Sequence, residues 1–241
     1  MIPKVIHYCW FGGNPLPESA KKCIASWRKF LPDYEIKEWN ESNFDVNIIP
    51  YTAEAYKAKK YAFVSDYARF WILYHHGGLY FDTDVEVIAN MDDIIAKGPF
   101  MGCCKDAPTG KEVAPGLGLG VNPGLGLYKE LLDLYATLHF VKPDGSLNLT
   151  TVVTYTTSVL AKHGLKEATD IQCIDGIWIY PHDYFDPWDY MIGKFERTAN
   201  TRSIHWYGKT WLPKENPAVE WAKRILRRIL GKNIKKRLLG K

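Results

Sequence analysis

Several features that would place this 241-residue chain in a common class of protein are missing. There is no uninterrupted apolar run of about 18 residues, so no membrane-spanning helix is expected. The N-terminus opens on a strand-like stretch, without a charged segment followed by a long apolar one, and we therefore expect no signal peptide. A Walker A phosphate loop and the Gly-x-Ser-x-Gly elbow of serine hydrolases are also absent.

The chain has few cysteines, and their number and spacing do not suggest a set of disulfide bonds. The five cysteines are an odd number, and Cys103 and Cys104 are adjacent. No Cys-x-x-Cys pair suggests a zinc site. This pattern favours a reduced, cytoplasmic setting over a disulfide-stapled secreted one.

Positive charge is concentrated at the C-terminus. From Ala218 onward there are nine Lys or Arg and a single acid, a balance of +8, while the whole chain carries only +4. The tail's apolar residues recur at helical spacing and predict one stripe on a basic amphipathic helix: Trp221, Ile225, Leu226, Ile229, Leu230, Ile234 and Leu238.

Such a helix can lie on an anionic membrane surface. We expect the tail to hold the protein peripherally on the inner face of the cell membrane. A solvated helix that packs on the body is the alternative. No nucleic-acid recognition motif accompanies the basic residues, so no nucleic-acid partner is expected.

The rest of the chain alternates between strand-like and helical patterns. Residues 5–10 and 34–39 read as strands and residues 18–30 as a helix between them, which is the start of a βαβ unit. We expect an α/β fold with a mixed, mostly parallel sheet flanked by helices over residues 1–215, followed by the tail at 216–241. Further expected elements are a long helix at 53–76 that ends at Gly77-Gly78, a strand at 79–88, and helices at 125–140 and 151–163.

Two aspartates lie within the strand expected at 79–88. Asp82 and Asp84 are two residues apart, so in a strand their carboxylates would share a face. Two like charges this close are unfavourable without a cation, and hard ions such as Mg²⁺ or Mn²⁺ take oxygen ligands. The pair predicts a metal site, although an Asp-x-Asp also occurs at ordinary solvent-facing strand ends.

Two charged residues stand in the apolar helix just before this strand. Asp66 and Arg69 are three residues apart and share a helical face. Because buried charges need partners, they either pair with each other or contact a ligand. The planar guanidinium suits a phosphate or a sugar equally.

Other candidates lie at the two ends of the chain. Trp10 follows the first strand, where open α/β sheets bind ligands, and it is either a core residue or a platform for a base. In the segment HWYGKTW, His205 is a candidate metal ligand, and Lys209 could reach a diphosphate. The glycines of GLGLG at 116–120 lack dinucleotide-binding spacing, which favours a flexible loop; a place in an acceptor groove is the alternative.

These segments together resemble a known enzyme family. IPKVIHYCWFGG, followed by SDYARFWILYHHGGLYFDTDVEV, is similar to the D-x-D sugar-binding glycosyltransferases of family 32. That family includes initiating mannosyltransferases and bacterial capsular polysaccharide transferases, and it is related to the clostridial glucosylating toxins. The resemblance is close over residues 1–90 and weaker to about residue 211.

The resemblance implies a GT-A type fold and a retaining, metal-dependent hexosyltransferase. The donor would be a nucleotide sugar, UDP-linked by preference and GDP-linked as the alternative. The metal would be Mn²⁺ or Mg²⁺, and the acceptor an oligosaccharide or lipid-linked glycan in bacterial surface polysaccharide (capsule) synthesis. It also implies a function for each matching residue: Trp10 stacks on the base, Asp66 and Arg69 hold the donor sugar, Asp82 contacts ribose and sugar hydroxyls or metal-bound water, Asp84 and His205 bind the metal, and Lys209 and Trp211 belong to an element that closes over the diphosphate.

A haloacid-dehalogenase-like phosphatase is the competing enzyme class, because an apolar strand leading into Asp-x-Asp is its entry motif too. Such enzymes usually place the motif on the first strand, whereas here it lies about 80 residues into the chain. They also usually have Thr or Val two positions after the second aspartate, and this chain has Glu86 there. For the acceptor side of a transferase, the sequence offers four unassigned candidates: Asp106, Glu112, His182 and Asp183.

Overall fold

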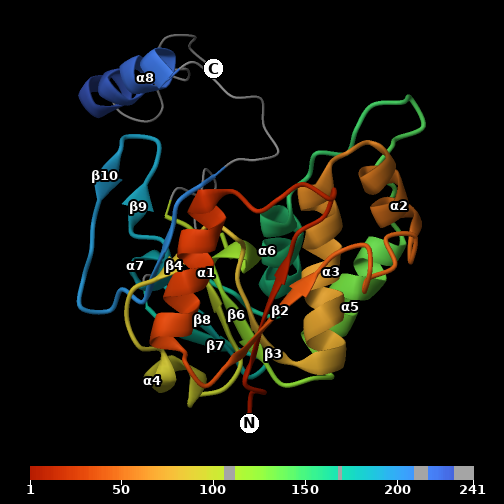
Figure 1. Cartoon of the computed structure of the whole chain (residues 1–241), viewed down its shortest axis with the longest axis horizontal. Coiled ribbons are helices and arrows are strands. Elements are labelled where there is room, and N and C mark those ends of the chain that lie inside the picture. Colours follow the sequence, from red (N-terminus) through yellow and green to blue (C-terminus); the bar gives the residue numbers. More distant parts are fainter. Residues whose placement is uncertain (106–111, 168–169, 209–216, 231–241) are drawn as a thin grey trace.

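A computed structural model describes residues 1–105, 112–167, 170–208 and 217–230 of the chain. A seven-stranded sheet forms its centre, in the order β2-β1-β3-β6-β5-β8-β7 (Figure 1). The pairings make every strand run the same way except β6 and β7, so the predicted mixed, mostly parallel sheet is confirmed. The strands are β1 (Val5–Cys9), β2 (Glu35–Trp39), β3 (Gly78–Tyr80), β5 (Phe100–Gly102), β6 (Leu119–Val121), β7 (Gln172–Ile174) and β8 (Ile177–Tyr180).

Helices cover both faces of the sheet (Figure 1). They are α1 (Glu18–Phe30), α2 (Pro50–Lys57), α3 (Tyr61–His76), α4 (Asp92–Ile95), α5 (Gly126–Ala136), α6 (Val152–Lys162) and α7 (His182–Phe185), with a 3-10 turn, η1, at Pro115–Leu117. Strand alternation divides the core in two: Tyr80 packs in the cluster with α3 and α5, whereas Leu79 and Phe81 pack with Trp27 of α1.

The helix expected at 53–76 is two helices instead of one. The α2 helix ends at Lys57 and α3 begins at Tyr61. Between them Lys59 has a φ of 57°, in the left-handed region. An L-residue in this conformation cannot continue a right-handed helix, so the chain turns here.

The strand expected at 79–88 is also divided. After β3 ends at Tyr80, the chain turns and β4 (Val85–Val87) joins β11 (Ser203–His205) in a separate two-stranded sheet. The Val85 amide donates to the Asp82 carbonyl at 3.0 Å, which closes the turn. Asp82 and Asp84 therefore lie on a turn, and the expectation that they share the face of one strand is wrong.

The GLGLG segment is buried, and the expectation of a flexible loop is wrong. It forms η1 and then β6, which lies between β3 and β5 at the centre of the sheet. Glycine is needed at this point because a Cβ on Gly120 would lie 2.1 Å from the ring of Phe100. The close approach of an aromatic ring to the backbone explains why this glycine occurs inside a strand.

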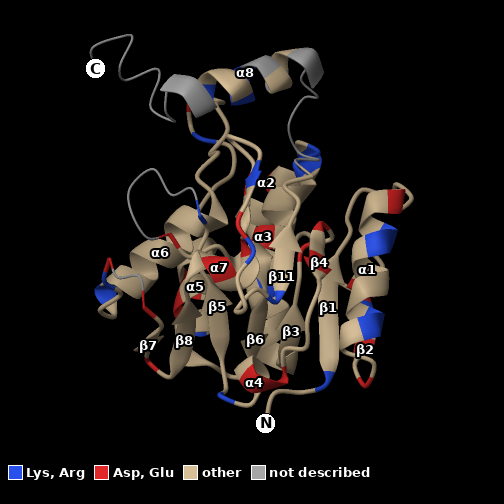
Figure 2. Cartoon of the chain, turned by 90° about the vertical axis from the view of Figure 1, so that its left-hand side faces the viewer, with Lys and Arg blue, Asp and Glu red and all other residues tan. Residues whose placement is uncertain are grey.

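Part of the predicted basic helix is present as α8 (Pro217–Leu230), at the end of the molecule opposite the N-terminus (Figure 1), and its predicted apolar residues Ile234 and Leu238 lie outside the described residues. Arg227 of α8 donates to the Met191 carbonyl at 3.4 Å, next to the hairpin of β9 (Trp188–Asp189) and β10 (Lys194–Phe195). Figure 2 shows its described basic residues in blue. Among the described helices, none is long and apolar enough to cross a membrane. A domain boundary at residue 215 stays a prediction.

Candidate active site

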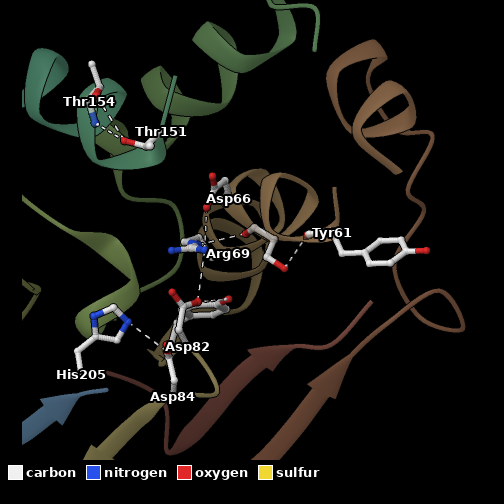
Figure 3. A network of polar contacts seen from close by, with 10 residues as sticks. Tyr61, Asp66, Arg69, Asp82, Asp84, Thr151, Thr154 and His205 are labelled. Carbon is white, nitrogen blue, oxygen red and sulfur yellow. Dashed lines mark hydrogen bonds and ion pairs between the residues drawn. The ribbon is translucent and has the colours of Figure 1, made fainter. Parts of the chain in front are cut away.

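Three separate parts of the chain bring five of the predicted residues together (Figure 3). The α3 helix carries Asp66 and Arg69, and the turn after β3 carries Asp82 and Asp84. His205 arrives from more than a hundred residues away, because β11 pairs with β4 and sets His205 opposite Val85. This pairing places the imidazole beside Asp84.

One guanidinium serves two carboxylates. The Nη2 atom of Arg69 lies 2.9 Å from Oδ1 of Asp66 and 3.3 Å from Oδ1 of Asp82. The guanidinium also lies 5.1 Å from the centre of the Tyr80 ring, whose hydroxyl donates to Asp82 at 3.1 Å. The two charged residues of α3 thus pair with each other, and the pair extends to the first aspartate of the Asp-x-Asp motif.

This arrangement places two carboxylates, the buried Asp66 and the half-buried Asp82, against a single cation. Burial raises the pKa of Asp66 to about 7, against the attraction of Arg69, and burial also raises the pKa of Asp82. Both shifts are expected where two carboxylates share a single cation away from water. The Nη1 atom of Arg69 is sealed from solvent and has no hydrogen-bond partner within the described part of the chain.

Asp84 is held by His205 and by a backbone amide. The His205 Nε2 atom lies 3.2 Å from Asp84 Oδ1, and the Gly208 amide donates to Asp84 Oδ2 at 2.7 Å. Burial opposes the charge on Asp84, but His205 and the Gly208 amide together outweigh it and lower the pKa of Asp84. Burial likewise disfavours the imidazolium, yet the nearby carboxylates, Asp84 first, raise the pKa of His205 to about 9.

The residues present fit a divalent cation. Asp82, Asp84 and His205 each offer one ligand atom, and these atoms all lie within 4.8 Å of one another. Two carboxylate oxygens and an imidazole nitrogen suit Mn²⁺-type ions, and a cation would offset the repulsion between the aspartates. Which metal the site takes stays a prediction.

The affinity of this site for Mn²⁺ is expected to rise with pH. Below about pH 9 His205 carries a proton that a metal must displace before it can bind the imidazole. We expect the Kd for Mn²⁺ to fall by about tenfold per pH unit between roughly pH 6 and 8, because one proton is released. Electron paramagnetic resonance titration of free Mn²⁺ measures this. The dependence should flatten in His205→Gln, and a flat profile in the unmodified chain would contradict the assignment.

Gly116 completes the site and was not identified as a site residue from the sequence. A Cβ at this position would lie 2.0 Å from Asp82 Oδ2 and 3.4 Å from Arg69 Nη1. The Gly116 carbonyl also accepts the Asp82 amide at 3.1 Å. Only a residue without a side chain therefore lets Asp82 keep its place.

We expect Gly116→Ala to displace the Asp82 carboxylate. A displacement of about 1 Å in a catalytic group can cost roughly 10²-fold in rate, and we expect a loss of this size in Mn²⁺-dependent hydrolysis of a sugar nucleotide. Gly126→Ala is the matched control, because a Cβ at Gly126 meets no atom within 4 Å. Equal activity of the two variants would show that Gly116 does not position Asp82.

Two further predicted residues make contacts outside this network. Trp10 is half-buried, and its indole donates to the Asn14 carbonyl at 2.6 Å. Asp183 receives hydrogen bonds from Thr198 and Asn200, each at 3.1 Å, and so holds a neighbouring turn. The candidates Asp106, Lys209 and Trp211 lie outside the described residues. Besides Gly116, sequence reasoning left Gly208 unassigned, although it stands within the HWYGKTW segment.

Residues 17–101 match a protein-family model described as "Glycosyltransferase sugar-binding region containing DXD motif". This interval contains Asp66, Arg69, Asp82 and Asp84, so the resemblance expected from the sequence is confirmed for these residues. It ends well before His205.

Two curated relatives share this part of the chain. The inositol phosphoceramide mannosyltransferase 1 of Schizosaccharomyces pombe is 30% identical over 111 residues, covering 42% of this chain and 33% of the relative. An uncharacterized glycosyltransferase of Acanthamoeba polyphaga mimivirus is 33% identical over 111 residues, covering 44% of each chain. The chain thus spans less than half the length of these relatives.

A solved structure shares the fold. The PaToxG glycosyltransferase superposes with a TM-score of 0.52 at 21% identity, covering 67% of this chain and 69% of that one. The predicted GT-A type α/β fold is confirmed by this likeness together with the sheet described above.

Proposed function

We propose that this chain, whose residues 17–101 carry the DXD sugar-binding region of glycosyltransferases, moves a sugar from a nucleoside-diphosphate donor to a glycan acceptor. The proposal depends on one observation: a pair of residues suited to sugar and phosphate oxygens and a pair suited to a cation belong to one network of contacts. Asp66 and Arg69, suited to sugar and phosphate oxygens, meet Asp82, and Asp82 meets the cation-binding pair of Asp84 and His205. The donor sugar and its diphosphate would lie side by side at such a junction.

The residues have distinct functions in this proposal. A bound divalent cation supplies positive charge that stabilises the leaving diphosphate. Asp84, His205 and Asp82 hold that cation. The Asp66 carboxylate accepts hydrogen bonds from donor-sugar hydroxyls, and Arg69 holds the Asp66 and Asp82 carboxylates in place. Trp10 stacks on the base.

Retention of anomeric configuration fits a front-face substitution. Asp66 and Asp82 are both occupied by Arg69, so neither is a free nucleophile for a covalent intermediate. The bond from the anomeric carbon to the phosphate oxygen breaks, the acceptor oxygen bonds to the same face, and the departing phosphate oxygen takes the acceptor's proton. Protein groups orient the donor and exclude water.

The contacts of Asp82 disfavour the phosphatase alternative. A haloacid-dehalogenase-like enzyme needs the first aspartate of its motif as a free nucleophile. Here Oδ1 of Asp82 receives the Tyr80 hydroxyl and faces Arg69. Both contacts reduce the nucleophilicity of that oxygen.

A donor screen tests the proposal. Purified protein with Mn²⁺ and no acceptor is incubated separately with UDP-glucose, UDP-galactose, UDP-N-acetylglucosamine and GDP-mannose. The last donor is included because the fission yeast relative is named a mannosyltransferase. We expect release of the nucleoside diphosphate from one donor, dependent on Mn²⁺. Hydrolysis of p-nitrophenyl phosphate without release from any nucleotide sugar would instead favour the phosphatase.

We further propose that the acceptor is a lipid-linked glycan of surface polysaccharide synthesis, such as a capsule, at the inner face of the membrane. The support is α8, where Val219, Trp221 and Leu226 are exposed and Trp221 is 66% exposed. Basic residues stand between these apolar residues in the sequence of the helix. Each basic residue near an anionic lipid surface contributes about 1 kcal/mol to membrane binding. The name of the fission yeast relative, which points to a ceramide lipid, agrees with a lipid-linked acceptor.

Removal of residues 218–241 is expected to abolish binding to phosphatidylglycerol vesicles and to leave donor hydrolysis unchanged, because no described site residue lies in this tail. Sedimentation with vesicles measures the binding, and neutral phosphatidylcholine vesicles are the control. Trp221→Ala should weaken sedimentation without changing the net charge. If the truncated chain sediments like the full chain, the tail does not dock the protein.

A further inference from the structure

The segment after β11 contacts Asp84 at two points. The Trp206 amide donates to the Asp84 carbonyl at 3.0 Å, and the Gly208 amide donates to Asp84 Oδ2 at 2.7 Å. The second bond uses one carboxylate oxygen and leaves the other, Oδ1, which faces His205 at 3.2 Å. Hydrogen bonds of this kind orient carboxylates that bind metals, so the position of the Gly208 amide bears directly on the proposed cation site.

Tyr207 lies between these two amides and has a backbone conformation that a tyrosine rarely adopts. Its φ is 51°, in the left-handed region, where a bulky L-residue is an outlier. Such a conformation persists only where the surrounding contacts impose it. The function proposed above gives Tyr207 no part, so the contacts of its side chain need an explanation of their own.

The hydroxyl and the ring of Tyr207 both make contacts that supply this constraint. The hydroxyl donates at 2.5 Å to Oδ2 of Asp186, a residue that is 0% exposed. The same oxygen accepts the Lys105 amide at 2.9 Å, which ties Asp186 to the chain beyond β5. Between ring centres, Tyr207 lies 4.4 Å from Tyr190 and 4.1 Å from His205. The side chain of Tyr207 is therefore held at both its ring and its tip.

The turn at Tyr207 leaves little freedom to the residue that follows. A Cβ at Gly208 would lie 3.3 Å from Asp84 Oδ2, so the backbone already approaches the carboxylate closely. A hydrogen bond to a charged oxygen is strong, but it weakens steeply as the angle at the hydrogen departs from linear. A rotation of the backbone at Tyr207 would therefore weaken the contact that orients Asp84.

Simple packing is the alternative explanation for Tyr207. A phenylalanine at this position would fill the same space and could make both ring contacts, but it could not bond to Asp186. The hydroxyl bond to a buried carboxylate is thus the contact that packing does not require. Because that bond is charge-assisted, it is strong enough to help hold the turn in its left-handed conformation.

We propose that Tyr207 is a positioning residue of the metal site. Its hydroxyl, held by Asp186, fixes the turn that brings the Gly208 amide to Asp84 Oδ2 and leaves Oδ1 for a divalent cation. This inference rests on the proposed function only in that Asp84 binds a cation, and it is independent of the donor sugar and of the nucleotide.

The amide proton of Gly208 tests this positioning without any metal. In the nuclear magnetic resonance spectrum of the glycine-labelled chain, an amide that donates to a carboxylate is displaced downfield, and Gly208→Ala removes and so identifies its signal. We expect Tyr207→Phe to move this signal upfield, because the bond to Asp84 lengthens. Tyr128→Phe is the matched control: Tyr128 is also buried, but its hydroxyl has no partner within the described residues, and the signal should stay in place.

Mn²⁺ affinity, measured by electron paramagnetic resonance without any nucleotide, is the second readout. Loss of a partner behind a metal ligand typically costs about 10- to 100-fold in affinity. We expect the lower value for Tyr207→Phe, which keeps the ring contacts, and the upper value for Tyr207→Ala, which loses them. Asp186→Asn should weaken binding less in Tyr207→Phe than in the unmodified chain, because both residues act through one hydrogen bond. Thermal melts verify that each variant is folded.

The proposal is overturned if Tyr207→Phe leaves either the Gly208 signal or the Mn²⁺ affinity unchanged, or if Asp186→Asn has the same effect with and without the Tyr207 hydroxyl. It is also overturned if the unmodified chain binds no Mn²⁺. Failure of every nucleotide sugar to react, with both readouts as expected, would overturn the proposed transferase and leave the positioning of Asp84 standing.

Discussion

Asp84→Asn is expected to lower the rate of Mn²⁺-dependent donor hydrolysis by about 10³-fold or more, since it removes charge stabilisation at the leaving group. Asparagine keeps the shape of the side chain and can still accept the Gly208 amide, but it loses the charge that faces His205. His205 can then release its proton, so no unpaired buried charge remains. We therefore expect the fold to be intact and the chemistry to be lost.

Release of nucleoside diphosphate at saturating Mn²⁺ measures this loss, and a thermal melt verifies the fold. Asp84→Ala should be equally inactive. Asp33→Asn is the control, because Asp33 is an exposed carboxylate that pairs only at the surface with Lys4. Ordinary turnover by Asp84→Asn would remove Asp84 from the mechanism.

Arg69→Met is expected to have the largest effect on stability. It leaves the buried Asp66 and the half-buried Asp82 without the cation that they share. Removal of one partner from a buried ion pair costs about 3–5 kcal/mol, which in a chain of this size lowers the melting temperature by roughly 6–20 °C. The side chain of Arg69 is only 4% exposed, so water compensates little for its loss.

The pH dependence of the stability loss in Arg69→Met follows from the direction of the pKa shift of Asp66. Burial already raises the pKa of Asp66 to about 7 with Arg69 present, and it rises further without it. A carboxyl whose pKa is raised on folding stabilises the fold at low pH, and the contribution fades as pH increases through the folded-state value. Arg69→Met should therefore melt closer to the unmodified chain at pH 5 than at pH 8.

A second substitution tests the same cause. The double variant Asp66→Asn with Arg69→Met lacks one of the two carboxylates that lose their cation. Part of the lost stability should therefore return. Thermal melts of the two single variants and the double variant complete the cycle. Strict additivity, or a loss that does not vary with pH, would show that Arg69 does not neutralise Asp66.

The structural features that the sequence predicted correctly depend on local patterns. Residues 18–30 form α1 with the expected bounds because Ala20, Ile24 and Trp27 fall on one helical face and bury against the sheet. Asp66 and Arg69 were singled out because charged residues in an apolar helix require partners. Both inferences need only the neighbouring residues.

The parts that failed depend on residues distant in sequence. β3 ends at Tyr80, after which the Asp82 amide bonds to the Gly116 carbonyl, and no local pattern at 79–88 reveals that partner. The glycines of GLGLG suggest a flexible loop, yet in the fold they leave room for the Phe100 ring and the Asp82 carboxylate.

Counting Mn²⁺ ions bound in the presence of UDP tests the central claim most directly, namely that Asp82, Asp84 and His205 hold a cation for a nucleoside diphosphate. Electron paramagnetic resonance of free Mn²⁺ gives the number of ions bound per chain with and without UDP. We predict a single tight site that UDP strengthens, that Asp84→Asn abolishes and that His205→Gln weakens. Mn²⁺ binding that is the same in these variants, or that UDP leaves unchanged, would contradict the account.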